Sequence, residues 1–240
     1  MIDINCDVGE GIANEHLLMP YITSCNIACG GHFGDKNSMD TTIFLALKNN
    51  VLIGAHPSFP DTENFGRKWM TISDEELQKS IKNQLDIFQE RMKIQKATLH
   101  HIKPHGALYN AIAVDEHLAT VFVNSIQKYM QNVYLFVPYE SEIEKVALNN
   151  DIKIKYEAFA DRNYNDNLTL VNRADKNSII TDKEQVFKHV SKMVFEGKVN
   201  TVSGDEKPIK ADTFCVHSDT ENALEIVQYL SQKMNKNTLF

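Results

Sequence analysis

Ionisable side chains follow short apolar segments at five places in this 240-residue chain. The apolar segments are residues 2–6, 51–55, 99–102, 154–160 and 213–216. They lead, in turn, into Asp7 and Glu10, His56, Lys103 and His105, Asp161 and Arg162, and His217 and Asp219. Short apolar runs of this kind are typical of buried strands. In parallel α/β enzymes the carboxyl ends of the strands converge on one concave face, so the sequence predicts a catalytic pocket there.

Local spacing supports a shared pocket. Asp7 and Glu10 stand three residues apart with glycines beside them, as expected of a turn that leaves a strand. Three glycines surround His32 in the segment 26–35, and Asp35 is placed to cap the next helix. Lys103 and His105 alternate along an extended segment, so their side chains point to the same side.

These residue types suit two kinds of chemistry. Histidines and carboxylates, with a lysine and an arginine, can perform general acid–base catalysis and stabilise an oxyanion. Histidine and aspartate are also ordinary metal ligands, and although no helical His-Glu-x-x-His motif is present, a metal site stays open. Nucleophilic catalysis by Cys29 or Ser218 would need an adjacent base, which the sequence does not locate. The remaining histidines are interpreted as surface or hydrogen-bonded core residues: His16, His100, His101, His117 and His189.

The elements that must position these residues alternate between strand and helix. Strands are predicted at residues 2–6, 22–28, 51–55, 98–102, 133–137, 152–158 and 212–216. Helices are predicted after the capping residues Ser73, Asp115 and Asp182, and from about Asp219. Because no linker or repeat interrupts the chain, we expect a single α/β domain over residues 1–240. Seven βα units favour a closed β/α barrel, and a doubly wound open sheet is the alternative.

Composition and motif content restrict the kinds of partner and ligand that the sequence predicts. The net charge of −7 gives no electrostatic footprint for nucleic acid or an anionic membrane. No apolar run approaches the roughly 20 residues of a membrane span, and no signal-peptide pattern opens the chain, so a cytoplasmic protein is expected. No Gly-Lys-Ser/Thr or Rossmann glycine pattern is present, so the chain shows no familiar nucleotide-binding loop. The four cysteines are expected to be buried free thiols rather than a metal site or a disulfide.

Six segments in this order resemble the LamB/YcsF family over essentially the whole chain. They are Asn5-Cys6-Asp7-Val8-Gly9-Glu10, Ser24-Cys25-Asn26-Ile27-Ala28-Cys29-Gly30, Gly54-Ala55-His56-Pro57, Phe65-Gly66-Arg67, Lys103-Pro104-His105-Gly106-Ala107-Leu108-Tyr109-Asn110 and Glu157-Ala158-Phe159-Ala160-Asp161-Arg162. Phe33 and Ser218 depart from the family pattern, which puts the shape of the pocket and the choice of substrate in question.

The resemblance implies a seven-stranded, irregular β/α barrel of the glycoside hydrolase and deacetylase type. It also implies ATP-dependent opening of 5-oxoproline (pyroglutamate) to L-glutamate together with partner subunits B and C. ATP would then bind through those partner subunits, and association of this chain with itself stays open. Two alternatives remain, a metal-dependent deacetylase or amidohydrolase on a related barrel and a non-catalytic subunit that binds a small molecule.

Residue roles follow from the resemblance. The expected catalytic residues are Asp7, Glu10, His32, His56, Lys103 and His105. The expected substrate-binding residues are Asn5, Asn26, Arg67, Tyr109, Glu157, Asp161, Arg162 and His217. Asp7 or Glu10 would activate water, the histidines of the first group would move protons, and Lys103 and Arg162 would hold the substrate carboxylate or a phosphoryl group.

Overall fold

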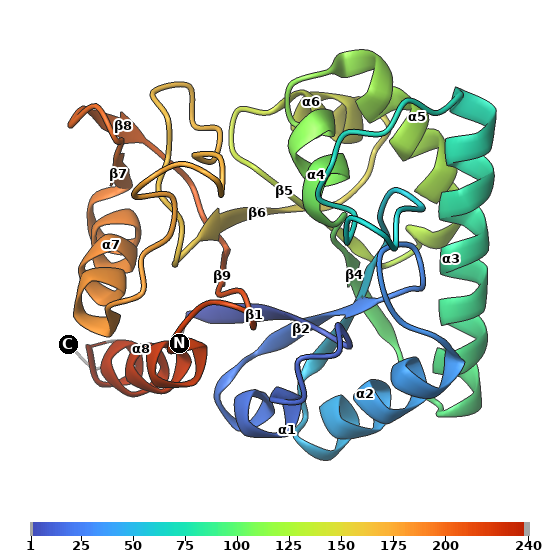
Figure 1. Ribbon diagram of the computed structural model, residues 1–240, viewed down its shortest axis with the longest axis horizontal. Helices are drawn as coiled ribbons and strands as arrows, with labels where there is room; N and C mark the ends of the chain where they lie inside the picture. Colours follow the sequence, from blue (N-terminus) through green and yellow to red (C-terminus); the bar gives the residue numbers. More distant parts are fainter. Residues whose placement is uncertain (1, 238–240) are drawn as a thin grey trace.

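Seven parallel strands form a closed barrel in the computed structural model, which describes residues 2–237, with side chains to Met234 (Figure 1). The strands are β1 (Asp3–Val8), β2 (Ser24–Ala28), β3 (Leu52–His56), β4 (Leu99–Ile102), β5 (Tyr134–Val137), β6 (Ile154–Phe159) and β9 (Thr213–Cys215). Strand β9 pairs in parallel with both β1 and β6 and closes the ring. The predicted β/α barrel is therefore confirmed and the open sheet is excluded. Met1 and residues 238–240 of the predicted domain lie outside the described residues.

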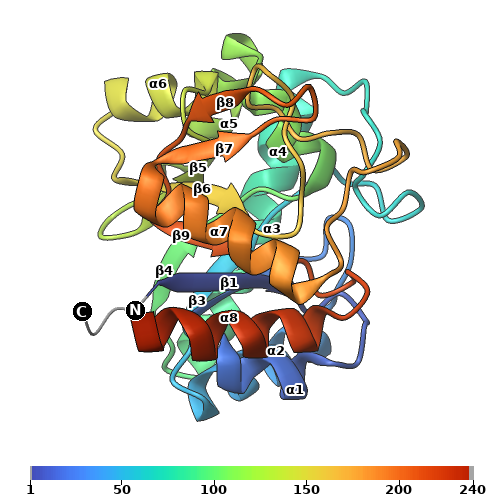
Figure 2. The same ribbon diagram turned by 90° about the vertical axis from the view of Figure 1, so that its left-hand side faces the viewer.

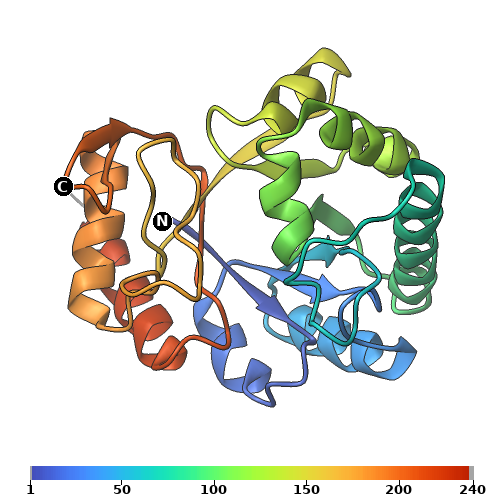
Figure 3. The ribbon, with the colours of Figure 1, turned by 45° about the horizontal axis from the view of Figure 1, so that its top comes forward.

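Helices surround the barrel, as Figure 3 shows most clearly. The α-helices are α1 (Glu15–Leu18), α2 (Lys36–Lys48), α3 (Asp74–Ile94), α4 (Gly106–Ile112), α5 (Glu116–Ile126), α6 (Glu142–Asn149), α7 (Lys183–Glu196) and α8 (Ala223–Asn237). Two short 3₁₀ segments, η1 (Met19–Tyr21) and η2 (Gln127–Tyr129), complete them. In Figure 2, α7 and α8 lie next to each other on one side of the barrel. None of the described helices is both long and apolar enough to cross a membrane.

Capping residues set the helix starts, largely as predicted. Asp35, Ser73, Asp115 and Asp182 each accept a hydrogen bond from the backbone N–H three residues on. The final helix begins at Ala223 rather than near Asp219. Asp219 instead forms ion pairs with two arginines, so its side chain is used in the loop and not at a helix start.

A small hairpin outside the barrel was not predicted. Strands β7 (Lys198–Asn200) and β8 (Glu206–Pro208) pair antiparallel. Each has only three residues, too few to produce a recognisable alternation of apolar and polar positions. The hairpin packs beside α7 and contributes no residue to the predicted site.

The inside of the barrel is polar, although the strands are buried on both faces. On β1, Ile4, Cys6 and Val8 belong to the hydrophobic core, while Asn5 and Asp7 alternate with them and are also buried. Successive side chains of a strand point to opposite faces, so the polar pair shares the face opposite the apolar residues. Buried polar groups require hydrogen-bond partners, and those partners come from the neighbouring strands.

Candidate active site

Asn26 joins the polar residues of β1 to those of β4. Its side-chain Nδ2 lies 2.7 Å from both Asn5 Oδ1 and Asp7 Oδ1. Its Oδ1 lies 2.6 Å from His101 Nε2, and because an amide oxygen only accepts, that histidine nitrogen carries the proton. The sequence suggested no more than a core or surface role for His101. The residue is indeed fully buried, but it also fixes the orientation of a predicted site residue.

Lys103 lies at the centre of a buried cluster of charges. Its Nζ is 2.9 Å from Asp7 Oδ1, 3.0 Å from Glu157 Oε1 and 3.0 Å from Cys215 Sγ. Burial alone would lower the pKa of Lys103, but Asp7 and its other anionic neighbours raise it well above its usual value. Burial alone would raise the pKa of Asp7, yet His56 and Lys103 hold it well below its usual value. Lys103 is therefore an ammonium and Asp7 a carboxylate at neutral pH.

A second cluster gathers Glu10, His32, His56 and His105 from four different loops or strand ends. Glu10 Oε1 lies 2.8 Å from His32 Nε2 and 3.4 Å from His105 Nδ1, and His56 Nε2 lies 3.0 Å from His105 Nδ1. The rings of His32 and His105 stack at 3.7 Å between centroids. Burial lowers the pKa of both His32 and His105, so these rings are neutral near pH 7. One ligand atom from each of the four residues lies within 4.8 Å of the others, a spacing that a metal ion could bridge.

The two clusters touch through Asp7. Its Oδ2 lies 3.4 Å from His56 Nε2, while its Oδ1 contacts Lys103. Carboxylate, ammonium and imidazole groups are thus continuous across the strand ends, which is the arrangement that proton transfer requires. The structure brings all six predicted catalytic residues together.

Asp161 and His217 form a third group after β6 and β9, and His217 places a ring nitrogen within 4.8 Å of an Asp7 oxygen. His217 Nδ1 lies 2.9 Å from Asp161 Oδ1, and both the His217 backbone N–H and the Thr220 hydroxyl donate to Asp161 Oδ2. Burial would raise the pKa of Asp161, but these contacts lower it below its usual value. The buried carboxylate holds the His217 loop in place, and His217 is the more exposed of the two.

Tyr109 and Glu157 carry polar atoms without a partner. The Tyr109 hydroxyl and Glu157 Oε2 are buried and make no hydrogen bond within the usual geometric limits. Burial, with Glu157 nearby, raises the pKa of Tyr109 well above its usual value, so the hydroxyl keeps its proton. The Tyr109 hydroxyl and the Glu157 carboxylate therefore lie close to each other, and Glu157 also contacts Lys103.

Arg162 does not point its guanidinium at the acid–base clusters. Its Nε and Nη2 donate to the backbone carbonyls of Ser178 and Val171. Burial lowers the pKa of Arg162 to about 10. The predicted substrate-binding arginine thus holds the long segment between β6 and α7, which is gold in Figure 3.

Two other arginines meet at Asp219. Arg67, which was predicted to bind substrate, and Arg173, which no motif in the sequence singled out, both pair with the Asp219 carboxylate. Two positive charges and one negative charge leave a net positive charge at this point. Burial lowers the pKa of Arg173, but Asp219 raises it above its usual value, with smaller contributions from Asp161 and Asp7. Asp219 follows His217, the partner of Asp161, by two residues, so the arginine pair adjoins that part of the site. No pattern of local spacing could have found Arg173, because it lies 46 residues from its partner.

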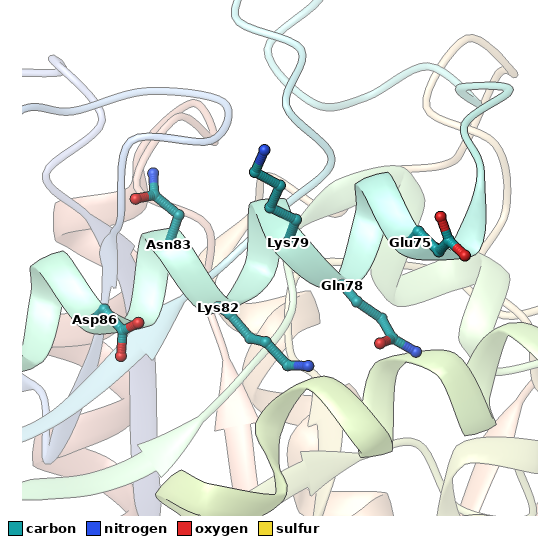
Figure 4. A pocket seen from close by; sticks show the side chains of 6 residues that line it. All are labelled: Glu75, Gln78, Lys79, Lys82, Asn83 and Asp86. Atoms are coloured by element: carbon teal, nitrogen blue, oxygen red, sulfur yellow. The ribbon is translucent and has the colours of Figure 1, made fainter.

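A surface pocket on the outer side of α3 lies apart from these groups (Figure 4). It is lined by Glu75, Gln78, Lys79, Lys82, Asn83 and Asp86. All six residues belong to one helix, and none is a predicted site residue. This pocket therefore contributes no residue to the predicted site.

Fold and site together define a β/α-barrel protein with a buried acid–base centre. The sequence model of the LamB/YcsF family matches residues 2–239. The chain belongs to the LamB/YcsF family.

Two similar proteins align with this chain over nearly their whole length. The chain is 39% identical over 234 residues to the A subunit of 5-oxoprolinase from Pyrococcus abyssi, covering 95% of this chain and 92% of that protein. It is also 39% identical over 240 residues to the protein of the same name from Staphylococcus aureus strain bovine RF122 / ET3-1, covering 98% and 96%.

Solved structures agree with the barrel. The lactam utilization protein from Thermus thermophilus superposes with a TM-score of 0.91 at 31% identity, covering 99% of this chain and 97% of that chain. A GH113 β-1,4-mannanase superposes with a TM-score of 0.53 at 11% identity, covering 96% and 98%, which shows a shared fold alone.

Proposed function

We propose that this chain is the A subunit of an ATP-dependent 5-oxoprolinase, which opens 5-oxo-L-proline to L-glutamate together with subunits B and C. The observation that carries the proposal is the buried Asp7–Lys103–Glu157 cluster, joined to the histidine cluster. It occurs in a family in which two relatives at 39% identity bear the name of the A subunit of 5-oxoprolinase.

The substrate explains the need for ATP. A five-membered lactam is a stable amide with a poor leaving amine. Phosphorylation of the amide oxygen by ATP would make the ring carbon electrophilic. Water would add to that carbon, and the C–N bond would break as the amine takes up a proton. Hydrolysis of the resulting acyl phosphate would release glutamate and inorganic phosphate. Because this chain carries no familiar phosphate-binding loop, we assign nucleotide binding to the partner subunits.

The hydrolytic step belongs to the two buried clusters. Asp7 and Glu10 are the candidate bases, and each is within 3.4 Å of an imidazole nitrogen that can pass a proton on. Lys103 keeps Asp7 ionised and correctly oriented. The unpartnered Tyr109 hydroxyl and Glu157 Oε2 can donate hydrogen bonds to, or accept them from, the lactam and its amine.

Binding of the substrate carboxylate or phosphoryl group requires a cationic side chain that is not already fully paired within the protein. Lys103 and Arg162 were expected to supply it, but the first contacts Asp7 and Glu157 and the second binds backbone carbonyls. Arg67 and Arg173 share a single carboxylate and keep a net positive charge. We assign anion recognition to this arginine pair.

Reconstitution tests the proposal. The chain is mixed with subunits B and C and ATP, and glutamate formed from 5-oxoproline is measured. We expect glutamate only when all three proteins and ATP are present. Glu10→Gln is expected to lower kcat at least ~100-fold, whereas the exposed control Glu75→Gln leaves kcat unchanged.

Three results would contradict it. Equal glutamate formation without this chain would make it a regulatory or small-molecule binding subunit. Ring opening by this chain alone, with a metal ion and without ATP, would make it a metal-dependent amidohydrolase. Full activity of Glu10→Gln and Asp7→Asn would remove the assigned site.

A further inference from the structure

His56 and His105 direct their remaining ring nitrogens at each other. His56 Nδ1 lies 2.7 Å from the Lys103 carbonyl oxygen, and His105 Nε2 lies 2.9 Å from the Phe65 carbonyl oxygen. A carbonyl only accepts, so both of these nitrogens carry hydrogen. The other two nitrogens, His56 Nε2 and His105 Nδ1, lie 3.0 Å apart, and His56 Nε2 also lies 3.4 Å from Asp7 Oδ2. With both rings neutral, these two nitrogens present lone pairs to each other.

Glu10 adds a third electron-pair donor to the same point. Its Oε1 lies 3.4 Å from His105 Nδ1 and 3.9 Å from His56 Nε2. All three side chains are buried, with side-chain exposures of 6% or less. Three electron-pair donors that face one another in a site with little water repel one another. This repulsion lowers the stability of the folded protein unless a cation lies between them.

The spacing suits a metal ion. Metal–ligand bonds of about 2.0–2.1 Å in a tetrahedral site place ligand atoms about 3.3 Å apart. The three separations here, 3.0, 3.4 and 3.9 Å, scatter around that value. The carbonyl contacts behind the two rings are also the outer partners that metal-bound histidines normally have, because they fix the tautomer and the ring orientation.

His32 is placed to hydrogen-bond Glu10 rather than to ligate the ion. Its ring is parallel to that of His105 within 4°, with centroids 3.7 Å apart. An ion in the plane of the His105 ring would lie at roughly the stacking distance from the plane of His32, farther than a bond of about 2.1 Å allows. His32 Nε2 instead lies 2.8 Å from Glu10 Oε1, where its N–H orients the carboxylate.

A neighbouring set of ligand-type atoms is already explained by protein contacts. Asp7, Cys215 and His217 also place ligand atoms within 4.8 Å of one another. The Lys103 ammonium, however, lies 2.9 Å from Asp7 and 3.0 Å from the Cys215 sulfur. A positive charge is therefore present there, whereas no described lysine or arginine contacts the point shared by Glu10, His56 and His105.

We propose that Glu10, His56 and His105 bind one divalent transition-metal ion, with His32 as a positioning residue for Glu10. Two imidazoles and a carboxylate favour Zn²⁺ and its first-row neighbours over Mg²⁺ or Ca²⁺, and the set leaves a coordination position open. The proposal concerns these residues and not the substrate, so it holds whether or not the chain is a 5-oxoprolinase subunit. With the ion bound, Asp7 rather than Glu10 is the candidate base.

Metal analysis of the full chain tests it. Protein purified without chelator or metal resin is stripped, then titrated with Zn²⁺ and with Co²⁺ as a spectroscopic probe. We expect one ion per chain, and X-ray absorption that shows two imidazoles. His56→Ala and His105→Ala are expected to weaken binding at least ~100-fold, and His32→Gln about 10-fold. His117→Ala, which removes an exposed histidine, is the matched control and leaves binding unchanged.

Two outcomes would overturn the proposal. If wild-type protein binds neither Zn²⁺ nor Co²⁺ at millimolar concentration, a shared proton and not a metal separates the two rings. If both histidine variants are folded by circular dichroism and bind as wild type, the ion is held elsewhere. Should the variants fail to fold, the absorption spectrum of the wild-type protein decides, because ligation without two imidazoles contradicts the assignment.

Discussion

Lys103 Nζ lies 2.9 Å from Asp7 Oδ1 and, on its other side, 3.0 Å from Glu157 Oε1. One buried ammonium thus lies between carboxylates from two strands, β1 and β6. All three side chains are nearly inaccessible, with exposures of 6% or less. Removing the cation leaves two buried carboxylates without their shared counter-ion.

Lys103→Met is therefore expected to destabilise the protein by about 3–5 kcal/mol, the usual cost of breaking a buried ion pair from one side. Urea unfolding followed by circular dichroism measures the loss. Lys145→Met, which removes an exposed lysine paired with Glu142, is the control and leaves the midpoint unchanged. A Lys103→Met protein as stable as wild type would show that the pair contributes nothing to folding.

His189 on α7 makes stability depend on pH. Its Nε2 is buried without a hydrogen-bond partner, and burial lowers the pKa of His189 to about 4. The unfolded chain, with a histidine pKa near ~6.5, binds the proton first as the pH falls. Stability is therefore retained above pH ~6.5 and falls by up to about 1.4 kcal/mol per pH unit between pH ~6.5 and ~4.

His189→Gln removes this contribution. The free energy of unfolding is measured by urea titration at about pH 7.5, 5.5 and 4.5. It is expected to fall less steeply for the variant than for wild type, and the difference reaches up to roughly 3 kcal/mol at the lowest pH. Exposed His117→Gln should follow the wild-type profile. Identical slopes for His189→Gln and wild type would mean that His189 titrates normally in the folded protein.

Gly54 on β3 is required by the ring of His101. A Cβ atom at position 54 would lie 2.1 Å from His101 Nε2, the nitrogen that donates to Asn26. Gly54→Ala is expected to cost about 3 kcal/mol in urea unfolding, since the ring must move and break a buried hydrogen bond.

A substitution at a second glycine distinguishes the effect of steric crowding at Gly54 from the effect of backbone strain. Gly204 has a positive φ, and a Cβ atom added there would meet no atom within 4 Å, so Gly204→Ala should cost only about 1 kcal/mol. Equal losses for the two variants would contradict the role of His101.

Arg162 fixes the segment between β6 and α7 through two backbone carbonyls. Arg162→Met is expected to lower stability by about 2 kcal/mol, because hydrogen bonds from a charged donor are lost. Trypsin should then cleave at Arg173 or Lys176 at least ~10-fold faster than in wild type, as mass spectrometry of the fragments would show. Unchanged cleavage would contradict the structural role of Arg162 and favour the substrate-binding role that the sequence suggested.

Sequence patterns were sufficient for the barrel because its signals are local. Apolar runs and capping residues such as Ser73 are read within a few positions, and the predicted strand limits differ from the observed ones by two residues at most. Helix α6 was missed although Ser141 caps it by accepting from the Glu144 N–H, a spacing that the sequence displays. The β7–β8 hairpin gave no comparable signal.

The site was predictable as a set of residues but not as a set of contacts. Position after a strand placed Asp7, Lys103 and His105 in one region, since strand ends converge. Whether a side chain faces that region depends on partners far along the chain. Arg162 turns to carbonyls 9 and 16 residues away, and Arg173 meets Asp219 46 residues away. Such contacts have no signature in spacing or composition.

The closing strand β9 has a consequence for synthesis of the protein. It lies between β1 and β6 and carries Cys215, whose sulfur contacts Lys103, and its loop supplies His217. A chain still lacking residues 213–217 leaves β1 and β6 as open edges and leaves the charged cluster incomplete. Because β9 must pair with both β1 and β6, ring closure waits until residues 213–215 have left the ribosome. The acid–base centre is therefore completed only after β9 has emerged, and a partly made chain exposes unpaired strand edges until then.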